Sequence, residues 1–504
     1  MGWHYAALED RFRRIAGIEG AWAILDWDTA VVMPNKAAAE RGEQLAVLRR
    51  LSHELLTHAE TGEQLAAAES ERDLDPWQAA NLREMRRRYR HAHAVEPALV
   101  EALARATTAC EMTWREARAR ADFAMLAGPL AEVVRLVREE ASVVGAALGL
   151  SPYDALLDAH QPDLRDAEVV ALFDQLAADL PPLLEAALAR QAAAPAPVEP
   201  AGPFPPARQK ELAKALMSRL GFDFEAGRLD ESLHPFCGGT PHDIRITTRY
   251  REDELVSALM GVLHETGHAL YEAGLPERWR GQPVGGQRGM VVHESQSLLM
   301  EMQACRSPAF VTFLTGELRA ALGDDPAFSP ANLARLYTRV ARGFIRVDAD
   351  EVTYPLHVIL RHRLERELIA GTLEVADLPD AWNEGMRALL GVVPPDDRFG
   401  CLQDIHWPVG GFGYFPCYTL GALLAAQLFR AACAQVPGLM DAIGRGDFAP
   451  LLGWLRAHVH GQGAMPRFAE LVARASGGPL AVEPFLGHLR ERYLGETPVG
   501  RPLA

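Results

Sequence analysis

The sequence predicts a mostly α-helical protein that contains a small β-sheet. Two patterns indicate this fold class. Ala, Leu, Glu and Arg dominate the first half of the chain, and apolar residues recur there at three- and four-residue spacing, as at Leu45, Leu48, Leu51 and Leu55. By contrast, residues 243–250 alternate in polarity and are rich in β-branched side chains, which is typical of a strand.

The helical pattern of the first half divides into consecutive segments. These segments lie near residues 37–60, 76–93, 95–125, 128–148 and 166–190. A proline-rich stretch from Ala194 to Pro206 follows, and we interpret it as an extended connection between helices and not as a boundary between separately folding domains. A short helix is expected from Gln209 to Leu220.

The second half combines the predicted strand with further helices. The GGTPHD segment at residues 238–243 is expected to form the turn of this strand. Helical patterning resumes at Glu252 and continues to the C-terminus, with loops near 274–290 and 393–416. We therefore expect a single domain over residues 1–504, with a helical part at 1–193 and a second part at 207–504.

Composition limits the possible partners and the compartment. The 504 residues include 67 acidic and 51 basic side chains, for a net charge of −16, which argues against nucleic acid or an anionic membrane as the main partner. None of the three lysines follows a glycine, so the chain has no phosphate-binding loop. No apolar run reaches the roughly 18 residues of a membrane span, and the six cysteines are scattered. These features predict a cytoplasmic protein.

The strongest functional signal is the sequence HETGH at residues 264–268. His264 and His268 are four residues apart in a segment, residues 252–273, that reads as an amphipathic helix. On a helix such side chains lie roughly 5–6 Å apart, close enough to share one Zn²⁺. Glu265 would flank the metal, where a carboxylate can take a proton from metal-bound water. Gly267 costs the helix about 1 kcal/mol relative to Ala, which suggests close approach of another group to the backbone.

A third protein ligand must come from another segment. Glu272 lies roughly 12 Å along the helix axis from His264, too far to share its metal. The next helical segment follows a Gly-rich loop and contains Glu294, the natural ligand for a His, His, Glu set with an open position for water. His293 and Glu301 are rivals, and spacing does not decide among the three.

Several blocks of sequence resemble the carboxypeptidase Taq family of thermostable metallocarboxypeptidases. They begin with LDWD at residues 25–28 and Met33-Pro34. The others are HPF at 234–236, DIRITT at 243–248, HETGH at 264–268, HESQS at 293–297, IRVDADE at 345–351, LQDIHW at 402–407 and GYFPCYTLG at 413–421. The resemblance covers most of the chain. In two places the sequence departs from the family pattern: Cys417 stands where Thr is usual, and Lys36 where Gly is common.

This resemblance implies a fold, a reaction and a site. It implies a saddle-like, mostly helical body with a deep active-site groove, and a homodimer that acts on peptides. It implies that His264, His268 and Glu294 bind Zn²⁺, which Co²⁺ often replaces, and that Glu265 is the general base and acid. It also implies removal of single residues from peptide C-termini, with broad side-chain preference and poor release of proline.

A carboxypeptidase must also recognise a terminal carboxylate, which a buried guanidinium group suits. Arg346 is the first candidate for this role and Arg245 the second. The alternative is a structural salt bridge, from Arg245 to Asp243 or from Arg346 to Asp348 or Asp350.

Other polar residues of the motifs are candidates for supporting roles. We expect His406 and Tyr418 to donate to the oxyanion or to the substrate, because they lie in a Gly-rich, non-helical stretch. For Tyr414, a buried and hydrogen-bonded tyrosine is an equal alternative. His234 and Asp243 are predicted to orient the metal ligands.

Two competing functions remain on the sequence alone. One is an oligopeptidase that cuts internally or releases dipeptides. The other is a non-catalytic helical module whose zinc is structural, which would require four protein ligands. Glu265, next to the first histidine, argues against the second.

Overall fold

The computed structural model describes residues 2–71, 73–232 and 235–496, and most of them are helical. The chain divides into two units, each assembled from three separate stretches. The first unit comprises Met1–Ala92, Ala196–Tyr337 and Gly421–Leu480, and the second comprises His93–Pro195, Thr338–Leu420 and Ala481–Ala504. Because these stretches alternate along the chain, the proline-rich connection is only one of several passages between the units. The expected single domain stays a prediction.

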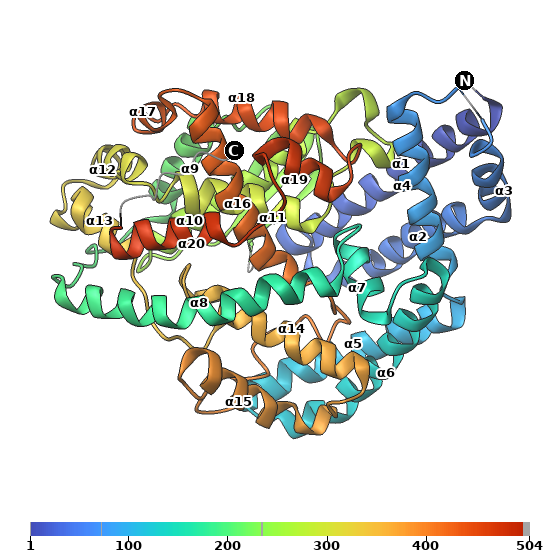
Figure 1. Ribbon diagram of the computed structural model, residues 1–504, viewed down its shortest axis with the longest axis horizontal. Coiled ribbons are helices and arrows are strands. Elements are labelled where there is room, and N and C mark those ends of the chain that lie inside the picture. Colours follow the sequence, from blue (N-terminus) through green and yellow to red (C-terminus); the bar gives the residue numbers. More distant parts are fainter. Residues whose placement is uncertain (1, 72, 233–234, 497–504) are drawn as a thin grey trace. The chain divides into compact units, whose positions relative to one another are not determined.

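The first unit begins with four helices around a shared core (Figure 1). Their bounds are α1 Trp3–Val31, α2 Ala38–Thr57, α3 Ala59–Ala68 and α4 Pro76–His93. Tyr5, Phe12 and Met85 are almost completely buried in this core. The predicted segment at 76–93 is confirmed as α4, whereas the sequence pattern did not indicate α1.

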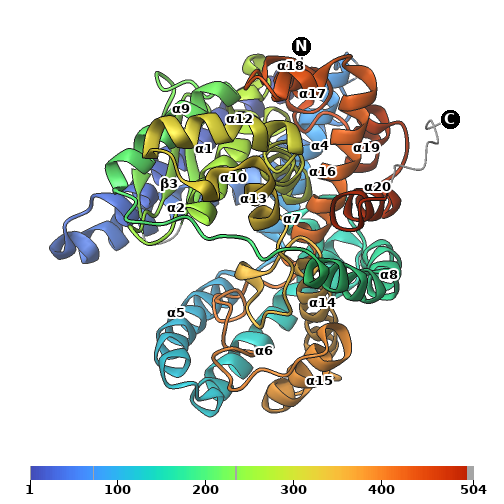
Figure 2. The same ribbon diagram turned by 90° about the vertical axis from the view of Figure 1, so that its left-hand side faces the viewer.

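A three-stranded sheet lies in the same unit, next to helix α10 (Figure 2). The strands are β1 Gly227–Glu231, β2 Phe236–Thr240 and β3 Asp243–Thr248, with β3 in the centre, parallel to β1 and antiparallel to β2. Ile244 and Ile246 on β3 are buried against α9 and α10, as the alternating sequence requires. The expected turn is wrong in extent, because Gly238–Thr240 belong to β2 and only residues 241–242 form the turn.

The remaining helices of the first unit follow the sheet. They are α9 Pro206–Leu220, α10 Val256–Gly274, α11 Met290–Leu298, α12 Pro308–Leu322, α13 Pro330–Tyr337, α17 Leu439–Ile443, α18 Ala449–His458 and α19 Phe468–Ser476. A π-helical segment, Leu299–Ala304, continues α11 directly. Helix α10 begins four residues later than expected because Arg251 and Glu254 form a β-bridge. The fold class is therefore confirmed as mostly helical with a small sheet beside α10.

The described residues of the second unit form helices joined by loops, with no strand among them. Its helices are α5 Pro97–Arg120, α6 Phe123–Leu148, α7 Pro152–His160, α8 Asp166–Ala193, α14 Tyr354–Ala370, α15 Leu378–Leu390 and α20 Glu483–Leu489. Helix α14 carries buried side chains on all sides, including His357, Arg361, His362 and Glu365. Buried polar groups require partners. Arg361, His362 and Glu365 find theirs within this unit, at Asp404, Asp166 and Trp407 respectively.

Helix α16, Pro416–Gln435, starts in the second unit and continues in the first. Among the described helices it alone has the length and apolar composition of a membrane span. However, 67% of its apolar window is buried inside the structure, as in the core helix of a soluble protein. The helix is therefore only weak support for a membrane span.

Candidate metal centre

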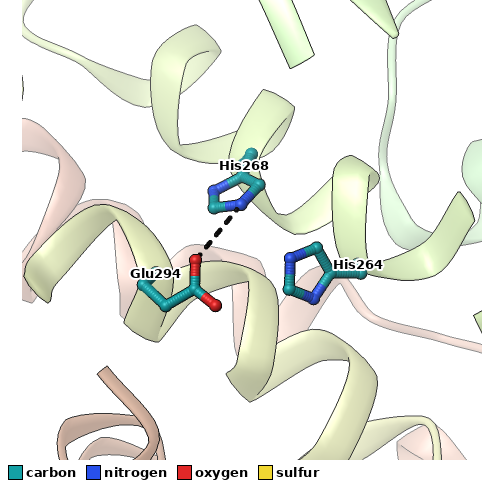
Figure 3. A group of neighbouring side chains, drawn as sticks. All are labelled: His264, His268 and Glu294. Carbon is teal, nitrogen blue, oxygen red and sulfur yellow. Dashed lines mark ion pairs between the residues drawn. The ribbon is translucent and has the colours of Figure 1, made fainter. Parts of the chain in front are cut away.

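Three electron-pair donors from two helices converge in the first unit (Figure 3). His264 and His268 extend from successive turns of α10, and Glu294 extends from α11. The donor atoms of the three side chains all lie within 4.8 Å of one another, and His268 Nε2 is 3.7 Å from a carboxylate oxygen of Glu294. Ligands at 2.0–2.1 Å from a tetrahedral zinc stand roughly 3.4 Å apart. The spacing therefore fits one metal ion after a small adjustment.

Hydrogen bonds fix which nitrogen each histidine offers. His264 Nδ1 is 2.9 Å from Glu301 Oε2, and His268 Nδ1 is 3.1 Å from the backbone carbonyl oxygen of His293. Both oxygens are acceptors, so in the neutral form that binds a metal each imidazole carries its proton on Nδ1 and presents the lone pair of Nε2. In His268 this lone pair faces the carboxylate of Glu294. Two acceptors that face each other are stabilised by a cation between them, so the donor chemistry fits a divalent metal.

The two helices that carry these donors approach each other very closely. A Cβ atom at Gly267 would lie 2.5 Å from the carbonyl oxygen of Gln296 and 2.6 Å from Cα of Ser297. Gly421 on α16 makes a similar approach, because a Cβ there would lie 2.7 Å from Cβ of Glu294. The inference that Gly267 permits a close approach is thus confirmed, and the group that approaches is the backbone of α11.

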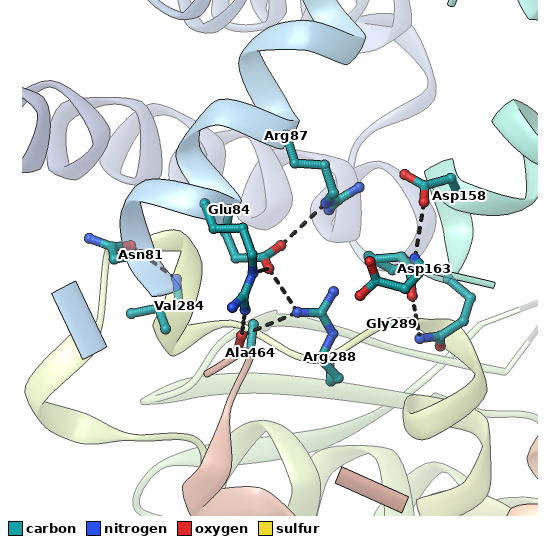
Figure 4. Close-up of polar contacts among 12 residues, drawn as sticks. Asn81, Glu84, Arg87, Asp158, Asp163, Val284, Arg288, Gly289 and Ala464 are labelled. Carbon is teal, nitrogen blue, oxygen red and sulfur yellow. Dashed lines mark hydrogen bonds and ion pairs between the residues drawn. The ribbon is translucent and has the colours of Figure 1, made fainter. Parts of the chain in front are cut away.

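The loop between α10 and α11 is held by a buried polar network (Figure 4). Arg288 is 1% exposed and donates to Glu84 Oε1 at 2.9 Å and to the carbonyl oxygen of Ala464 at 3.1 Å. The backbone N–H of Val284 donates to Oδ1 of Asn81 at 3.2 Å. These contacts with α4 and with the stretch Gly421–Leu480 fix the point at which α11 begins, and therefore the position of Glu294.

Glu265 lies between the two histidines along α10 and is almost completely buried. Burial raises the pKa of its carboxyl group to about 7; the charge of Glu294 adds to this effect, and His264 opposes it. For His264, burial would lower the pKa, but Glu301 and Glu294 raise it to about 9. Burial lowers the pKa of His268 well below its usual value.

The structure separates the three candidates for the third donor. Glu294 alone joins the two histidines. The His293 ring packs beside that of His268, but its Nε2 lies 3.0 Å from Glu272 Oε1 and not among the three donors. Glu301 contacts the opposite nitrogen of His264, and its other oxygen accepts a hydrogen bond from Arg306 at 2.5 Å.

In the second unit, Arg346 lies in a buried salt bridge. Its guanidinium group donates to Asp404 Oδ1 at 2.8 and 3.2 Å and to the hydroxyl of Tyr354 at 2.8 Å. Arg361 binds the other oxygen of Asp404 at 2.7 Å. The salt-bridge alternative is thus present, but its partner is Asp404 and not Asp348 or Asp350. Recognition of a substrate carboxylate by Arg346 stays a prediction.

Arg245 and Asp243 also form a salt bridge with each other. Arg245 donates to the two carboxylate oxygens of Asp243 at 2.7 and 2.8 Å and stacks on the ring of Trp27. The expected contact of Asp243 with a metal ligand is therefore not observed, because its side chain binds Arg245. His234, the other residue predicted to orient the ligands, lies outside the described residues.

His406 and Tyr418 contact each other in the second unit, with His406 Nε2 3.1 Å from the tyrosine hydroxyl. Burial lowers the pKa of His406 to about 4, and Arg346 adds to the effect while Asp404 opposes it. His406 is therefore neutral at pH 7. Tyr414 packs edge-on against Tyr418, with ring centroids 5.1 Å apart. The role of these residues as donors to the oxyanion stays a prediction.

The sequence analysis did not find the contacts of three polar residues that hold the site residues in place. These are Glu301, Asp404 and Arg361. Asp404 lies within the LQDIHW motif, so its position was a usable signal. Arg361 lies in α14, most of whose residues are buried, and a buried charge needs a partner, but the mixed composition of this helix gave no such signal in the sequence.

Two histidines in HExxH spacing on one helix, with a glutamate from a second helix, are typical of the class of metallopeptidases. The comparison with known proteins specifies the family. The chain belongs to the carboxypeptidase Taq family, because the family described as carboxypeptidase Taq (M32) metallopeptidase matches residues 7–493. The protein is therefore a metallocarboxypeptidase that acts on peptides.

Individual relatives resemble nearly the whole chain. Thermostable carboxypeptidase 1 of Thermus thermophilus is 40% identical over 503 residues, covering 97% of this chain and 98% of the relative. Among solved structures, metallocarboxypeptidase 1 of Trypanosoma cruzi has a TM-score of 0.96 at 39% identity, covering 97% of this chain and 99% of the other. The M32 carboxypeptidase from Deinococcus radiodurans R1 has a TM-score of 0.92 at 36% identity, covering 98% and 99%.

Proposed function

We propose that this metallocarboxypeptidase binds Zn²⁺ through His264 Nε2, His268 Nε2 and the carboxylate of Glu294. It uses the metal to release single amino acids from peptide C-termini. The observation that carries the proposal is the convergence of these three donors, two of them fixed by hydrogen bonds that Nδ1–H donates to Glu301 and to the His293 carbonyl oxygen. Two imidazoles and one carboxylate are a usual catalytic zinc set, with the fourth position open to water.

Glu265 is the general base and acid in this proposal. When bound, the metal acidifies a water molecule and polarises the peptide carbonyl. The Glu265 carboxylate accepts a proton from this water and returns it to the departing amine. Its position one residue after His264 on α10 supports a role beside the metal and not among the ligands.

Other residues are proposed to bind the substrate. Arg346 is the first candidate for the terminal carboxylate and Arg245 the second, although each already pairs with an aspartate. Asp404 pairs with Arg346 and also with Arg361, so this cluster has one more positive than negative charge. His406, neutral at pH 7, and Tyr418 are the proposed oxyanion donors.

The broader expectations are part of the proposal. They are a wide choice of C-terminal side chains with poor release of proline, replacement of Zn²⁺ by Co²⁺, a homodimer, and a cytoplasmic location without nucleic acid or membrane partners. The net charge of −16 supports the last of these.

The test combines metal add-back with defined peptides. Protein stripped by a chelator is reloaded with Zn²⁺ or Co²⁺ and incubated with peptides that differ only in the C-terminal residue, each also as its amide. We expect stepwise release of single residues from the free peptides, slow release of proline, and no release from the amides. Release of dipeptides, or equal cleavage of the amides, would instead indicate an oligopeptidase.

The base assignment has its own test in Glu265→Gln. This variant keeps the three donors, so we expect it to bind one metal ion per chain. Its kcat should fall by about 10²–10⁴-fold, the usual contribution of a general acid–base group. A variant that keeps its metal and a near-wild-type kcat contradicts the role of Glu265.

A further inference from the structure

The two helices of the candidate site run antiparallel, and each histidine of α10 faces a different carboxylate. His268 lies opposite Glu294 on α11. His264 lies one turn away and contacts Glu301, which belongs to the π-helical segment after α11. The continuous stretch of α11 and its π-helical extension therefore supplies Glu294 to the donor set and Glu301 to the Nδ1 side of His264.

Both oxygens of Glu301 are engaged by protein groups. Oε2 lies 2.9 Å from His264 Nδ1, and Oε1 accepts from Nη2 of Arg306 at 2.5 Å. The Glu301 residue is 8% exposed. With its oxygens directed to these two partners, Glu301 is held beside the imidazole of His264.

We propose that Glu301 is a positioning residue for the metal, and that Arg306 holds it in place. The inference rests on the proposed metal binding by His264, His268 and Glu294. Glu301 fixes the ring orientation and the tautomer of His264, so that Nε2 is always the nitrogen with the lone pair. It is not itself a ligand.

The chemistry of the carboxylate explains why this position requires a glutamate. An ionised carboxylate only accepts hydrogen bonds, so His264 Nδ1 must carry the proton. A carboxamide both donates and accepts, and a Gln at position 301 could donate to Nδ1 and leave the proton on Nε2, which blocks a metal. A carboxylate on the distal nitrogen also makes the imidazole a stronger ligand.

The local backbone supports the assignment. Residues Leu299–Ala304 form a π-helical turn, a geometry that is rare and that frequently occurs at functional sites. The two histidines are supported unequally. His268 donates to a neutral backbone carbonyl group, and His264 donates to a carboxylate. Loss of Glu301 should therefore weaken one metal–ligand bond specifically.

The test measures zinc affinity by competition with a chromophoric chelator, separately from activity. We expect Glu301→Gln to raise the zinc dissociation constant by about 10–100-fold. It should also change the visible absorption spectrum of the Co²⁺-loaded protein, which reports ligand geometry. The matched control is Glu272→Gln, which removes a nearby carboxylate that contacts His293, outside the proposed donor set. Its dissociation constant should stay within a few-fold of wild type.

A second variant allows for a failure to fold. Glu301→Gln alone leaves the half-buried guanidinium group of Arg306 without its carboxylate, which can destabilise the protein. The double variant Glu301→Gln/Arg306→Gln removes both charges, and we expect it to fold and to bind zinc as weakly as the single variant. Wild-type affinity and an unchanged cobalt spectrum in the folded variants would overturn the positioning role.

His264→Ala separates this inference from the proposed function. If His264→Ala loses zinc but Glu301→Gln binds it like wild type, the positioning role is wrong and the proposed metal site stands. If His264→Ala binds zinc like wild type, the proposed metal site is itself wrong, and the inference falls with it.

Discussion

Each of the two units contains a buried cluster of ionisable side chains, and the two clusters differ in how their charges are balanced. In the second unit, the carboxylate of Asp404 lies between the guanidinium groups of Arg346 and Arg361. In the first unit, His268 Nε2 and the Glu294 carboxylate are both acceptors and face each other at 3.7 Å. The cluster of the second unit contains its own counter-charges. Among the described residues, the cluster of the first unit lacks a positive charge between its two acceptors, which a bound cation would supply.

The difference explains which cluster is the better candidate for a metal. Burial alone would raise the pKa of Asp404, but Arg361 and Arg346 lower it far below its usual value. The Asp404 carboxylate is therefore ionised and already neutralised by its two arginine partners, so it does not need a metal ion. Buried donors such as those of the first unit remain costly unless they are paired or coordinate a metal.

The largest expected effect is the loss of metal chemistry in His264→Ala. The variant lacks one of three donors, so it should not retain zinc through gel filtration. A bound metal contributes several kcal/mol to the transition state, so kcat should fall by about 10³-fold or more. The matched control is His293→Ala, because the His293 side chain binds Glu272 and packs beside the His268 ring, while the hydrogen bond that His268 Nδ1 makes goes to the backbone carbonyl of His293, which the variant keeps. Zinc content measured by mass spectrometry should be normal in the control, and equal zinc loss in both variants would contradict the donor set.

The second-largest expected effect is a loss of stability, without loss of metal, when the Asp404 cluster is disrupted. Asp404→Asn leaves Arg346 and Arg361 buried without their carboxylate, and breaking a buried pair in this way costs about 3–5 kcal/mol of unfolding free energy. Denaturant unfolding should detect this loss, while one zinc ion per chain should remain bound. Loss of zinc at full stability would show that the contrast between the clusters is wrong.

A pH dependence of stability is expected from Glu365, a buried carboxylate whose partners are neutral. Trp407 Nε1, the Tyr153 hydroxyl and the Gly413 backbone N–H all donate to it. Burial raises its pKa from 4.5 to about 7 although these hydrogen bonds oppose the shift. Because the folded pKa exceeds the unfolded one, Glu365 contributes stability that is fully present below pH 4.5 and is lost as the pH rises through 7.

The comparison with Glu365→Gln isolates this contribution. At about 1.4 kcal/mol per pKa unit, the unfolding free energy of wild type relative to the variant should fall by about 3 kcal/mol between these two pH values. Urea titrations of both proteins across this range provide the measurement. Parallel pH profiles would show that Glu365 titrates normally.

The smallest effect concerns the approach of α10 to α11. Gly267→Ala places a Cβ against backbone atoms of Gln296 and Ser297, and we expect it to lower the unfolding free energy by about 1–3 kcal/mol. Gly261→Ala on the same helix is the matched control, because nothing lies within 4 Å of its Cβ position. The control should gain about 0.5–1 kcal/mol from helix propensity. Equal gains in both variants would contradict the close approach.

The sequence was most informative where the chemistry is local. Helix α4 and strand β3 follow from side-chain periodicity, and the pairing of His264 with His268 follows from their four-residue spacing on one helix. Gly267 signalled a close approach because glycine is unfavourable inside a helix. None of these inferences requires knowledge of how distant segments pack.

Contacts between distant segments were less predictable. Successive residues of a helix differ by about 100° in direction, so the choice among His293, Glu294 and Glu301 depends on the rotation of α11 about its axis. That rotation is set by packing around Gly267 and Gly421. In the same way, the pairing of Arg346 with Asp404 joins residues far apart in sequence, and charge alone favoured nearer aspartates.

The most direct test of the central claim is a crystal structure of the zinc-loaded protein with anomalous data at the zinc edge. We predict a single strong peak at about 2.0–2.2 Å from His264 Nε2, His268 Nε2 and a carboxylate oxygen of Glu294, with no fourth side chain. A peak elsewhere, or one ligated by His293 or Glu301, would contradict the account.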